Sequence, residues 1–373
     1  MAIKNKSLDT MIIGFVGLGL IGGSIAKSIR RVYPNYIIYG YDSDKVALQN
    51  AKDDGTLDFI VKDVYEEFYE CNYVFLCTPV GHNMAYLSIL KDAVNPDCII
   101  TDVGSVKGPI HELVKTLGLE KRFIGGHPMV GSEKSGYSAC HDRLIENAYY
   151  FLTPTKKVSP EKVVELNAFI EELGALTIHL DPDQHDSFTA GISHVPHLIA
   201  CELVHQVANL DTENGILRQL AAGGFKDITR IASSSPEVWE QIIISNRKNI
   251  AGILHNMIED LTQLHDAVNN ADNDFIHEYF RKANDYRSSV PDNAVGLMQK
   301  SYEIFMDIPD EPGELLKVLK IVSDHHISIK NVGIIHNREY QEGCLKLVFY
   351  SNEECELCEA LFRNHHYIVY QRK

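Results

Sequence analysis

Gly17-Leu18-Gly19-Leu20-Ile21-Gly22 directly follows the apolar run Met11–Gly17 and opens the amphipathic stretch Leu20–Arg31. A G-x-G-x-x-G spacing is informative when it lies between a strand and a helix, as it does here. Gly17 permits the tight turn, Gly19 lets the backbone approach a pyrophosphate, and Gly22 lets the helix pack against the strand. The six residues therefore predict a dinucleotide-binding turn, with a flavin site or a merely glycine-rich turn as the alternatives.

Asp42 ends the next apolar run, 20 residues beyond Gly22. A carboxylate at this point can accept hydrogen bonds from both hydroxyls of the adenosine ribose, and it would repel a 2′-phosphate. The following residues, Ser43 and Asp44, supply no arginine to bind such a phosphate. The pattern favours NAD over NADP. A role for Asp42 as the N-cap of the following helix is the structural alternative.

Short β-branched runs alternate with amphipathic stretches from about residue 10 to residue 180. The expected strands are Met11–Gly17, Tyr36–Asp42, Tyr73–Thr78, Cys98–Val103, Phe123–Gly125, Ala148–Thr153 and Ala175–Leu180. Strands that alternate with helices need crossover connections and form a mostly parallel, doubly wound sheet. We predict a Rossmann-like α/β dinucleotide-binding domain over residues 1–180.

The character of the chain changes twice after residue 180. Through about residue 292 the apolar positions recur at helical spacing, which predicts an all-α dimerisation and substrate domain over residues 181–295. After a linker at Ser288–Gln299, the order of runs is β-α-β-β-α-β, the ferredoxin-like α+β arrangement, over residues 299–373.

The composition excludes several classes of function. The chain has 373 residues, of which 45% are hydrophobic and 23% charged, as in a globular protein, and no apolar run is long enough to cross a bilayer. Its formal charge of -16 repels phosphate backbones and anionic membrane surfaces, so we expect neither a nucleic acid nor a membrane as partner.

Cysteine usage and the N-terminus suggest a cytoplasmic protein. The eight cysteines lie in hydrophobic stretches and are expected to be reduced and mostly buried. Cys355 and Cys358 have metal-like spacing but stand alone, so we predict no metal site there. Lys4, Lys6 and the apolar run from Met11 imitate a secretory signal, but the same residues carry the dinucleotide-binding pattern, which argues for a cytoplasmic location.

Polar residues follow the carboxyl ends of the strands in the first domain. Thr78-Pro79 and Asp102-Val103-Gly104-Ser105 follow two strands, and in open α/β sheets ligands bind beyond such strand ends, so Thr78, Pro79 and Val103 should flank the nicotinamide. His127 follows the next strand, and an imidazole suits the removal of a hydroxyl proton as hydride leaves the same carbon. Ser105 as a helix cap and His127 as a structural histidine are the alternatives.

The second domain contributes two pairs at helical spacing. His194 and His197, in Ser193-His194-Val195-Pro196-His197, share one face of a helix. Asp227 and Arg230 have the same i, i+3 relation, so the carboxylate could hold the guanidinium for bidentate binding of a substrate carboxylate. An ordinary surface ion pair is the alternative for the second pair. Hydride transfer to NAD requires no metal, and none is predicted.

Several motifs together resemble a known family. GLGLIGGS, DVGSVKG, GGHPMVGSEKSG, SHVPH and GFKDITRIASSSPEVW look like prephenate dehydrogenase, and SYEIFMDIPDEPGELLKVL onward resembles an ACT domain. The resemblance covers nearly the whole chain. It implies NAD-dependent oxidative decarboxylation of prephenate to 4-hydroxyphenylpyruvate in tyrosine biosynthesis, by a homodimer formed through the helical domain.

The resemblance also implies residue roles. His127 becomes the hydrogen-bond acceptor for the C4 hydroxyl, oriented by Ser105, and both are catalytic. Arg230, held by Asp227, binds the ring carboxylate, while His197 and Glu133 surround the pyruvyl side chain. His194 and Trp239 match the pattern and are interpreted as support for the pocket.

Three alternatives stay open at this stage. The accepted side chain could be the amino acid of arogenate. A β-hydroxyacid dehydrogenase would need a catalytic lysine on the helical domain, for which Asn246-Arg247-Lys248-Asn249 is the nearest match. A non-catalytic NAD or amino-acid sensor is the third.

The C-terminal domain is expected to be regulatory. Small ligands of ACT-type domains sit near the turn after the first strand, here Asp310-Glu311-Pro312-Gly313. Gly313 permits close backbone approach, and Asn331 on the second strand could hold a polar group. We expect tyrosine to bind there and to inhibit the enzyme, with a domain that only adds dimer surface as the alternative.

Overall fold

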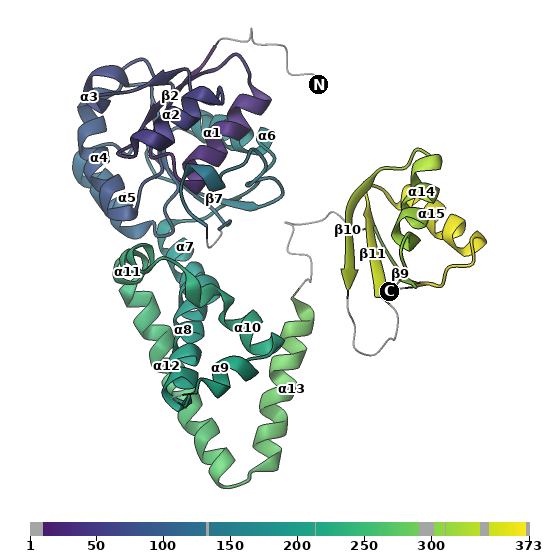
Figure 1. Ribbon diagram of the computed structural model, residues 1–373. Helices are drawn as coiled ribbons and strands as arrows, with labels where there is room; N and C mark the ends of the chain where they lie inside the picture. The colour runs from purple at the N-terminus through teal and green to yellow at the C-terminus, as the bar shows by residue number, and fades with distance from the viewer. Residues whose placement is uncertain are drawn as a thin grey trace. The chain divides into compact units, whose positions relative to one another are not determined.

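The computed structural model describes residues 10–131, 134–212, 214–290, 302–309, 311–335 and 343–370. The chain divides into two compact units, Met1–Val290 and Pro291–Lys373. Within the first unit, strands and helices alternate up to His179 and only helices follow, as Figure 1 shows in its purple-to-green part.

The first unit begins with a five-stranded parallel sheet. Its strands are β1 (Ile12–Val16), β2 (Ile37–Tyr41), β3 (Phe59–Ile60), β4 (Tyr73–Leu76) and β5 (Ile99–Asp102), in the order β3-β2-β1-β4-β5. The connecting helices are α1 (Leu20–Val32), α2 (Lys45–Asp53), α3 (Val64–Glu67), α4 (Val80–Ala93) and α5 (Gly108–Leu117). Because the chain continues to opposite sides of β1, a ligand crevice is expected beyond the carboxyl ends of β1 and β4.

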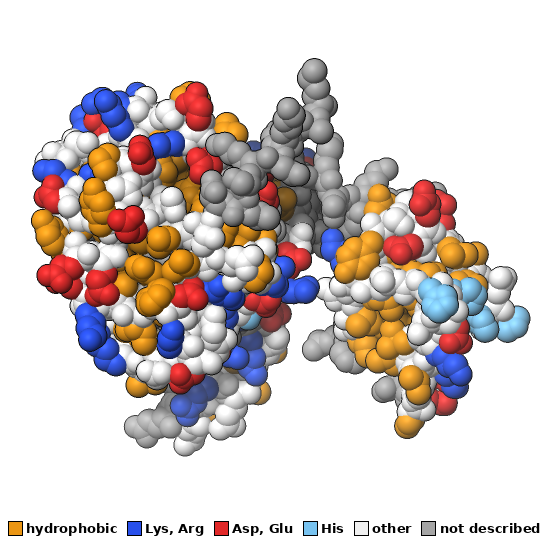
Figure 2. Space-filling view, turned by 90° about the horizontal axis from the view of Figure 1, so that it is seen from above, with side chains coloured by type: hydrophobic (Ala, Val, Ile, Leu, Met, Phe, Trp, Pro, Cys, Tyr) orange, Lys and Arg blue, Asp and Glu red, His pale blue; other side chains and the backbone are white. Residues whose placement is uncertain are grey.

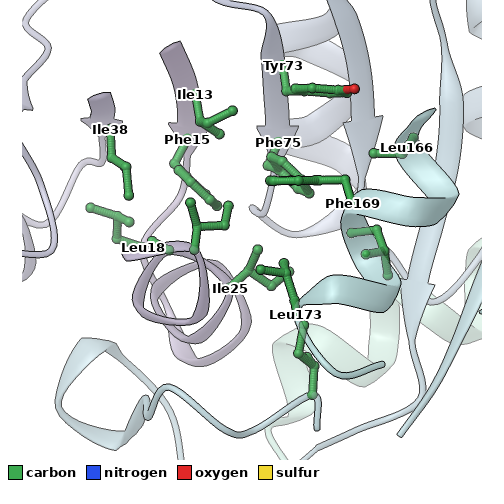
Figure 3. Close-up of a cluster of buried hydrophobic side chains, with 14 of the residues drawn as sticks. Ile13, Phe15, Leu18, Ile25, Ile38, Tyr73, Phe75, Leu166, Phe169 and Leu173 are labelled. Atoms are coloured by element: carbon green, nitrogen blue, oxygen red, sulfur yellow. The ribbon is translucent and has the colours of Figure 1, made fainter. Parts of the chain in front are cut away.

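Both faces of this sheet are buried, as the continuous apolar strands require. Phe15 and Phe75 lie on one face, with ring centroids 5.2 Å apart, beneath Phe169 of α6 (Pro160–Glu172). Figure 3 shows this cluster together with Ile25 of α1. The alternate residues, Val74 and Leu76 among them, belong to a second cluster on the other face. Replacing such a buried phenylalanine with alanine typically costs about 3–5 kcal/mol.

The remaining strands correct the prediction of one mostly parallel sheet. β6 (Ile124–Pro128), β7 (Tyr149–Pro154) and β8 (Leu176–His179) form a separate sheet in which β6 and β7 are antiparallel. A single bridge, Ile100 to Phe123, joins this sheet to β5. The described connection from β6 to β7 contains one 3-10 turn, Tyr137–Ala139, and no crossover helix. Two neighbouring strands that are joined without a crossover run antiparallel.

The helical part of the first unit follows the predicted pattern. It comprises α7 (Pro182–Thr189), a π-helical segment Ala190–His194, α8 (Val195–Leu210), α9 (Ile216–Leu220), α10 (Gly223–Thr229), a 3-10 segment Arg230–Ser233, α11 (Pro236–Ser245), α12 (Arg247–Asn269) and α13 (Asn273–Ser289). Its buried apolar cluster is small and centres on Ala190, Val195 and Ile250. Large apolar side chains remain exposed along it, including Ile258 at 63% and Phe280 at 68%.

The second unit has the predicted β-α-β-β-α-β order. Its elements are β9 (Tyr302–Ile308), α14 (Glu314–Asp324), β10 (Ile329–Ile335), β11 (Gly343–Phe349), α15 (Asn352–Asn364) and β12 (Val369–Tyr370), with sheet order β10-β11-β9-β12 and antiparallel pairing. Cys355 and Cys358 are buried in its apolar core, and burial raises the pKa of the Cys358 thiol to about 12.

The surface of the protein carries charges of both signs. On the face drawn in Figure 2, acidic and basic side chains are interspersed over the larger unit, and histidines are visible on the smaller one. Among the described residues, no helix is long and apolar enough to cross a membrane. The apolar residues of the signal-like stretch, Ile12–Val16 and those from Leu20, form β1 and the start of α1, so they belong to the folded domain.

Candidate active site

The glycine turn between β1 and α1 has the geometry that a dinucleotide requires. Gly17 has φ +99°, and a Cβ at Gly22 would lie 2.2 Å from the Gly17 carbonyl oxygen, so neither position accepts a side chain without a shift. A Cβ at Gly19 would meet no described atom within 4 Å, so the turn faces open space there. Gly19 is the N-cap of α1 and no side chain caps its amides within the described chain, which leaves them for a phosphate. The turn also contains Leu18, Leu20 and Ile21, whose place in an NAD site stays a prediction.

Asp42 lies beside this turn. Its carboxylate accepts the Leu18 amide at 2.6 Å and the Asp44 amide at 2.8 Å. The cap of α2 is Asp44, whose side chain accepts from Val46 and Ala47, so the alternative role of Asp42 as that cap is wrong. Two carboxylate oxygens offer about four acceptor positions, which leaves capacity for ribose hydroxyls.

The turns after β4 and β5 border the same crevice by their topology. The Thr78 amide and hydroxyl both donate to Asn83 Oδ1, at 3.0 and 2.7 Å, and Pro79 is the N-cap of α4. Val103 follows β5 and packs partly buried against the core. These contacts fix the backbone at the two turns that were predicted to flank the nicotinamide.

A cavity of about 370 Å³ brings residues of the α/β and helical parts together. The four predicted catalytic residues all line this cavity, and each comes from a different segment of the chain. They are Ser105, His127, His197 and Arg230. The lining residues are Ser105, His127, Met129, Val130, Gly131, Ser193, His194, His197, Arg230, Ile231, Ser234, Val238, Trp239 and Ile242. A mixed lining of apolar and a few convergent polar groups is typical of a small-molecule site.

His127 lies on β6 and is 8% exposed. Its Nδ1 is 2.8 Å from Nε2 of His185, whose Nδ1 is 2.8 Å from Asp186 Oδ1. Burial, with His185 and Lys107 nearby, holds the pKa of His127 well below its usual value. The imidazole is therefore neutral at pH 7, as a proton acceptor must be.

Lys107 is the fully buried cation beneath this histidine. Its Nζ donates to Asp102 at 2.5 Å and to the Gly126 carbonyl at 2.7 Å. Burial lowers the pKa of Lys107, while the Asp102 carboxylate opposes that effect. Lys107 stands in the DVGSVKG motif, yet its side chain had no predicted role, because spacing alone does not show which lysines are buried.

His197 and Trp239 form a stacked pair in the cavity wall, with ring centroids 3.7 Å apart. His197 Nδ1 is 2.9 Å from the Ser193 carbonyl, and burial lowers its pKa. His194 is 1% exposed, and burial lowers its pKa to about 4. Both histidines of the H-x-x-H pattern thus face one cavity, with Trp239 beside them.

The support of Arg230 by Asp227 stays a prediction. Asp227 is exposed on α10, and the described lining of the cavity includes Arg230 but not Asp227. The i, i+3 argument assumed a continuous α-helix, but α10 ends at Thr229 and the chain turns into the 3-10 segment at Arg230. Glu133, predicted near the pyruvyl side chain, lies outside the described residues.

Lys248 is exposed on α12 and does not line the cavity, which contains no lysine among its described residues. A β-hydroxyacid dehydrogenase would need one there. The fold and cavity instead define an NAD-dependent dehydrogenase whose polar cavity groups are imidazole, hydroxyl and guanidinium.

Comparison with known proteins gives the family. The family model "Prephenate dehydrogenase, nucleotide-binding domain" matches residues 25–179, and "Prephenate dehydrogenase, dimerization domain" matches residues 181–282. The prephenate dehydrogenase of Bacillus subtilis (strain 168) is 36% identical over 358 residues, which span 95% of this chain and 96% of that protein. The chain belongs to the prephenate dehydrogenase family and is an NAD-dependent oxidoreductase.

Solved structures with a similar fold support the same family assignment. Prephenate dehydrogenase from A. aeolicus, in complex with hydroxyphenyl propionate and NAD+, is 33% identical with a TM-score of 0.71, covering 77% of this chain and 100% of that one. Synechocystis arogenate dehydrogenase is 31% identical with a TM-score of 0.66, covering 75% of this chain and 100% of that one.

Proposed function

We propose that this enzyme converts prephenate to 4-hydroxyphenylpyruvate by oxidative decarboxylation. The observation that carries the proposal is the common cavity of Ser105, His127 and Arg230, in a chain whose relatives over nearly its full length are prephenate dehydrogenases. Bound NAD+ supplies the acceptor for the hydride from ring C4.

The chain's own residues move the proton and hold the carboxylates. His127 accepts the proton of the C4 hydroxyl, and Ser105 orients that hydroxyl. Arg230 binds the ring carboxylate, which leaves as CO2 while the ring becomes aromatic. His197, with Glu133, contacts the pyruvyl side chain, and Asp227 holds the guanidinium of Arg230. Leu18, Leu20, Ile21, Thr78, Pro79 and Val103 belong with Asp42 and the glycines to the NAD site.

The test is NADH absorbance during turnover of prephenate and of arogenate, each with NAD and NADP. The proposal predicts turnover of prephenate with NAD. Turnover of arogenate alone would establish the alternative substrate, which the likeness to Synechocystis arogenate dehydrogenase keeps open. NAD binding without turnover of either substrate would favour a sensor.

We also propose that two copies associate through the helical part. Ile258 on α12 and Phe280 on α13 are exposed apolar side chains, and this region matches the dimerization-domain model of the family. Clustered exposed apolar side chains are typical of an interaction site. Ile258→Glu should shift the enzyme toward monomer in analytical ultracentrifugation. Val164→Glu on α6, another exposed apolar position, serves as the control and should leave the dimer intact.

The C-terminal unit is proposed to act as an ACT-type domain that binds tyrosine and inhibits the enzyme. Gly313 has φ +97° at the N-terminus of α14, and Asn331 is exposed on the edge strand β10. Inhibition requires that tyrosine bind two enzyme states with different affinity, and a coupling of about 1–3 kcal/mol suffices. An enzyme ending near residue 298 should turn over but lose its sensitivity to tyrosine. Unchanged, competitive inhibition would instead place tyrosine in the catalytic cavity. A cytoplasmic location, where prephenate metabolism takes place, completes the proposal.

A further inference from the structure

Two imidazoles of the cavity are connected to the same residue, Asp186 of α7. On one side, His127 Nδ1 is 2.8 Å from His185 Nε2, and His185 Nδ1 is 2.8 Å from the Asp186 carboxylate. On the other side, Asn246 Nδ2 is 3.1 Å from His194 Nδ1 and 2.7 Å from the Asp186 backbone carbonyl. Each imidazole is thus linked through one intermediary side chain to an atom that can only accept hydrogen bonds.

The first branch determines where His127 carries its proton. The Asp186 carboxylate accepts the amides of Lys107 and Gly108 at 2.7 and 2.8 Å. Burial acts to raise its pKa, but the hydrogen bonds from His185 and these amides outweigh burial and lower the pKa, so the carboxylate is ionised. Burial lowers the pKa of His185, so this imidazole is neutral at pH 7. Because the ionised carboxylate only accepts, the proton of His185 is on Nδ1 and its Nε2 is an acceptor. His127 must then donate from Nδ1. Its Nε2 is left as the acceptor nitrogen.

The second branch gives His194 the opposite arrangement. The Asn246 amide nitrogen donates one hydrogen to the Asp186 carbonyl and the other to His194 Nδ1. The orientation of this amide is fixed because its oxygen accepts from Asn249 Nδ2 at 2.8 Å. His194 therefore carries its proton on Nε2.

That Nε2–H group of His194 is unsatisfied. The atom is buried and has no hydrogen-bond partner among the described residues, although His194 lines the cavity. A buried donor without a partner costs about 1–3 kcal/mol. Such a group is stabilised when a ligand oxygen accepts from it.

We propose that Asp186 fixes opposite tautomers at the two imidazoles, so that His127 accepts from the ligand and His194 donates to it. His185 and Asn246 are positioning residues in this arrangement. The cavity then selects a ligand with a hydroxyl at one point and an oxygen acceptor, either a carboxylate or a carboxamide carbonyl, at the other. The identity of the hydroxyl as that of prephenate rests on the proposed function, whereas the tautomers do not.

The direct test is NMR of the intact wild-type protein labelled with 15N at histidine. Long-range 1H–15N correlations distinguish the two ring nitrogens, and the spectra of His127→Asn and His194→Gln assign the two residues. At pH 7.5, His127 should be protonated at Nδ1 only and His194 at Nε2 only. Protonation of His127 at Nε2, or of His194 at Nδ1, overturns the proposal whether or not prephenate is the substrate.

A matched pair of variants tests the first branch in catalysis. A glutamine at position 185 can donate from its amide nitrogen to Asp186 and accept with its oxygen from His127, whereas leucine can do neither. His185→Leu should lower kcat by about 30-fold or more without a comparable rise in KM, and His185→Gln should recover most of that loss. Equal kcat in the two variants contradicts the positioning role.

A second pair identifies the oxygen that His194 binds. His194→Phe should raise KM about 10-fold or more for one ligand, while His194→Gln, which keeps an N–H donor, should raise it less. A higher KM for prephenate would show that His194 donates to a substrate oxygen. A higher KM for NAD would show that it donates to the nicotinamide carboxamide. Unchanged KM values for both ligands in His194→Phe show that His194 donates to neither.

Discussion

A histidine can accept a substrate proton only while its acceptor nitrogen is unprotonated. His127 meets this condition because burial, His185 and Lys107 lower its pKa well below 6.5. A protonated His127 could not accept the substrate proton. We therefore expect kcat/KM to remain constant as the pH is lowered through 6.5 and to fall only at more acidic pH. A pH profile with prephenate checks this expectation. An acidic limb centred above pH 6.5 would contradict it.

His127→Asn provides the complementary measurement. Asparagine keeps a polar group in the cavity but has no basic nitrogen, so kcat should fall by on the order of 100-fold with a modest change in KM. Steady-state kinetics with NAD in excess gives both values. Unchanged kcat would assign the proton transfer to another group.

Arg230 should act on binding. Its removal in Arg230→Ala takes away a charge-assisted contact to a carboxylate, so KM for prephenate should rise by roughly 30-fold or more. Arg247→Ala is the matched control, because Arg247 is exposed at the start of α12 and is not among the cavity residues. A loss confined to kcat would show that the guanidinium serves catalysis rather than binding.

Asp42 should decide between NAD and NADP. Its carboxylate beside the glycine turn repels a 2′-phosphate, so the wild type should prefer NAD and Asp42→Ala should narrow the preference. Because Asp42 also accepts the Leu18 amide, the variant should bind NAD more weakly as well. Asp53→Ala, an exposed change on α2, should alter neither value. If the wild type uses NAD and NADP equally well, Asp42 does not discriminate against the 2′-phosphate of NADP.

At the scale of elements, two helices of the C-terminal unit end in the same way. His326 and His366 have φ +56° and +67°, and the amides of Ile327 and Tyr367 return to the carbonyls of Val322 and Phe362. This is the Schellman ending, in which glycine is the favoured residue at the left-handed position. The backbone, rather than the imidazole, therefore dictates the conformation at these two histidines.

His326→Gly and His366→Gly should each stabilise the C-terminal unit by about 0.5–1 kcal/mol, because glycine removes the cost of a side chain in this conformation. Hydrogen exchange of the β9 and β11 amides in the full chain should slow accordingly. His325→Gly is the control, since His325 has φ -99° and should gain nothing from glycine. Faster exchange in His326→Gly would show that the imidazole itself contributes.

The sequence predicted most elements but not every pairing. The sequence predicted β1, β2, β4 and β5, because their apolar runs are separated by helix-length stretches. Strands that alternate with helices in this way form a parallel sheet. The direction of β6 against β7 could not be predicted, because it depends on a connection without periodicity. The π-helical segment Ala190–His194 shifts the helix register by one residue and has no composition signal of its own.

The candidate site was predictable where chemistry coincides with position. His127, Ser105, His197 and Arg230 stand at strand ends or helix faces, and the structure places them in one cavity. The sequence did not predict a role for His185 and Asp186, because they look like ordinary polar residues near the start of a helix. Only the tertiary fold brings them close to His127. Lys107 was missed for the same reason.

At the scale of the whole molecule, buried neutral histidines make stability depend on pH. Burial lowers the pKa of His111 to about 4, with Lys107 adding to the effect. Its pKa in the unfolded chain is about 6.5. Between these values the unfolded chain binds more protons, so the free energy of unfolding falls as pH decreases from 6.5 toward 4. The loss from His111 alone is on the order of 2–3 kcal/mol.

Urea unfolding at pH 7 and pH 5 measures this loss. His111→Gln, which can keep a hydrogen bond to the Thr153 hydroxyl, should reduce the difference between the two pH values. His82→Gln is the control, because His82 is exposed and should leave the difference unchanged. An identical pH difference in wild type and His111→Gln would mean that His111 is not protonated on unfolding.

The two contacts of Asp186 with the amides of Lys107 and Gly108 have a consequence for exchanging parts between relatives. The first helix of the helical part closes the start of α5 in the nucleotide-binding part, so the boundary at residue 180 does not separate independent modules. A chimaera that joins the first 180 residues of one relative to the helices of another should retain NAD binding, and it should keep turnover only if those helices supply a carboxylate at the position of Asp186 to the two backbone amides. Recombination at this boundary would then be tolerated only between relatives that keep this carboxylate.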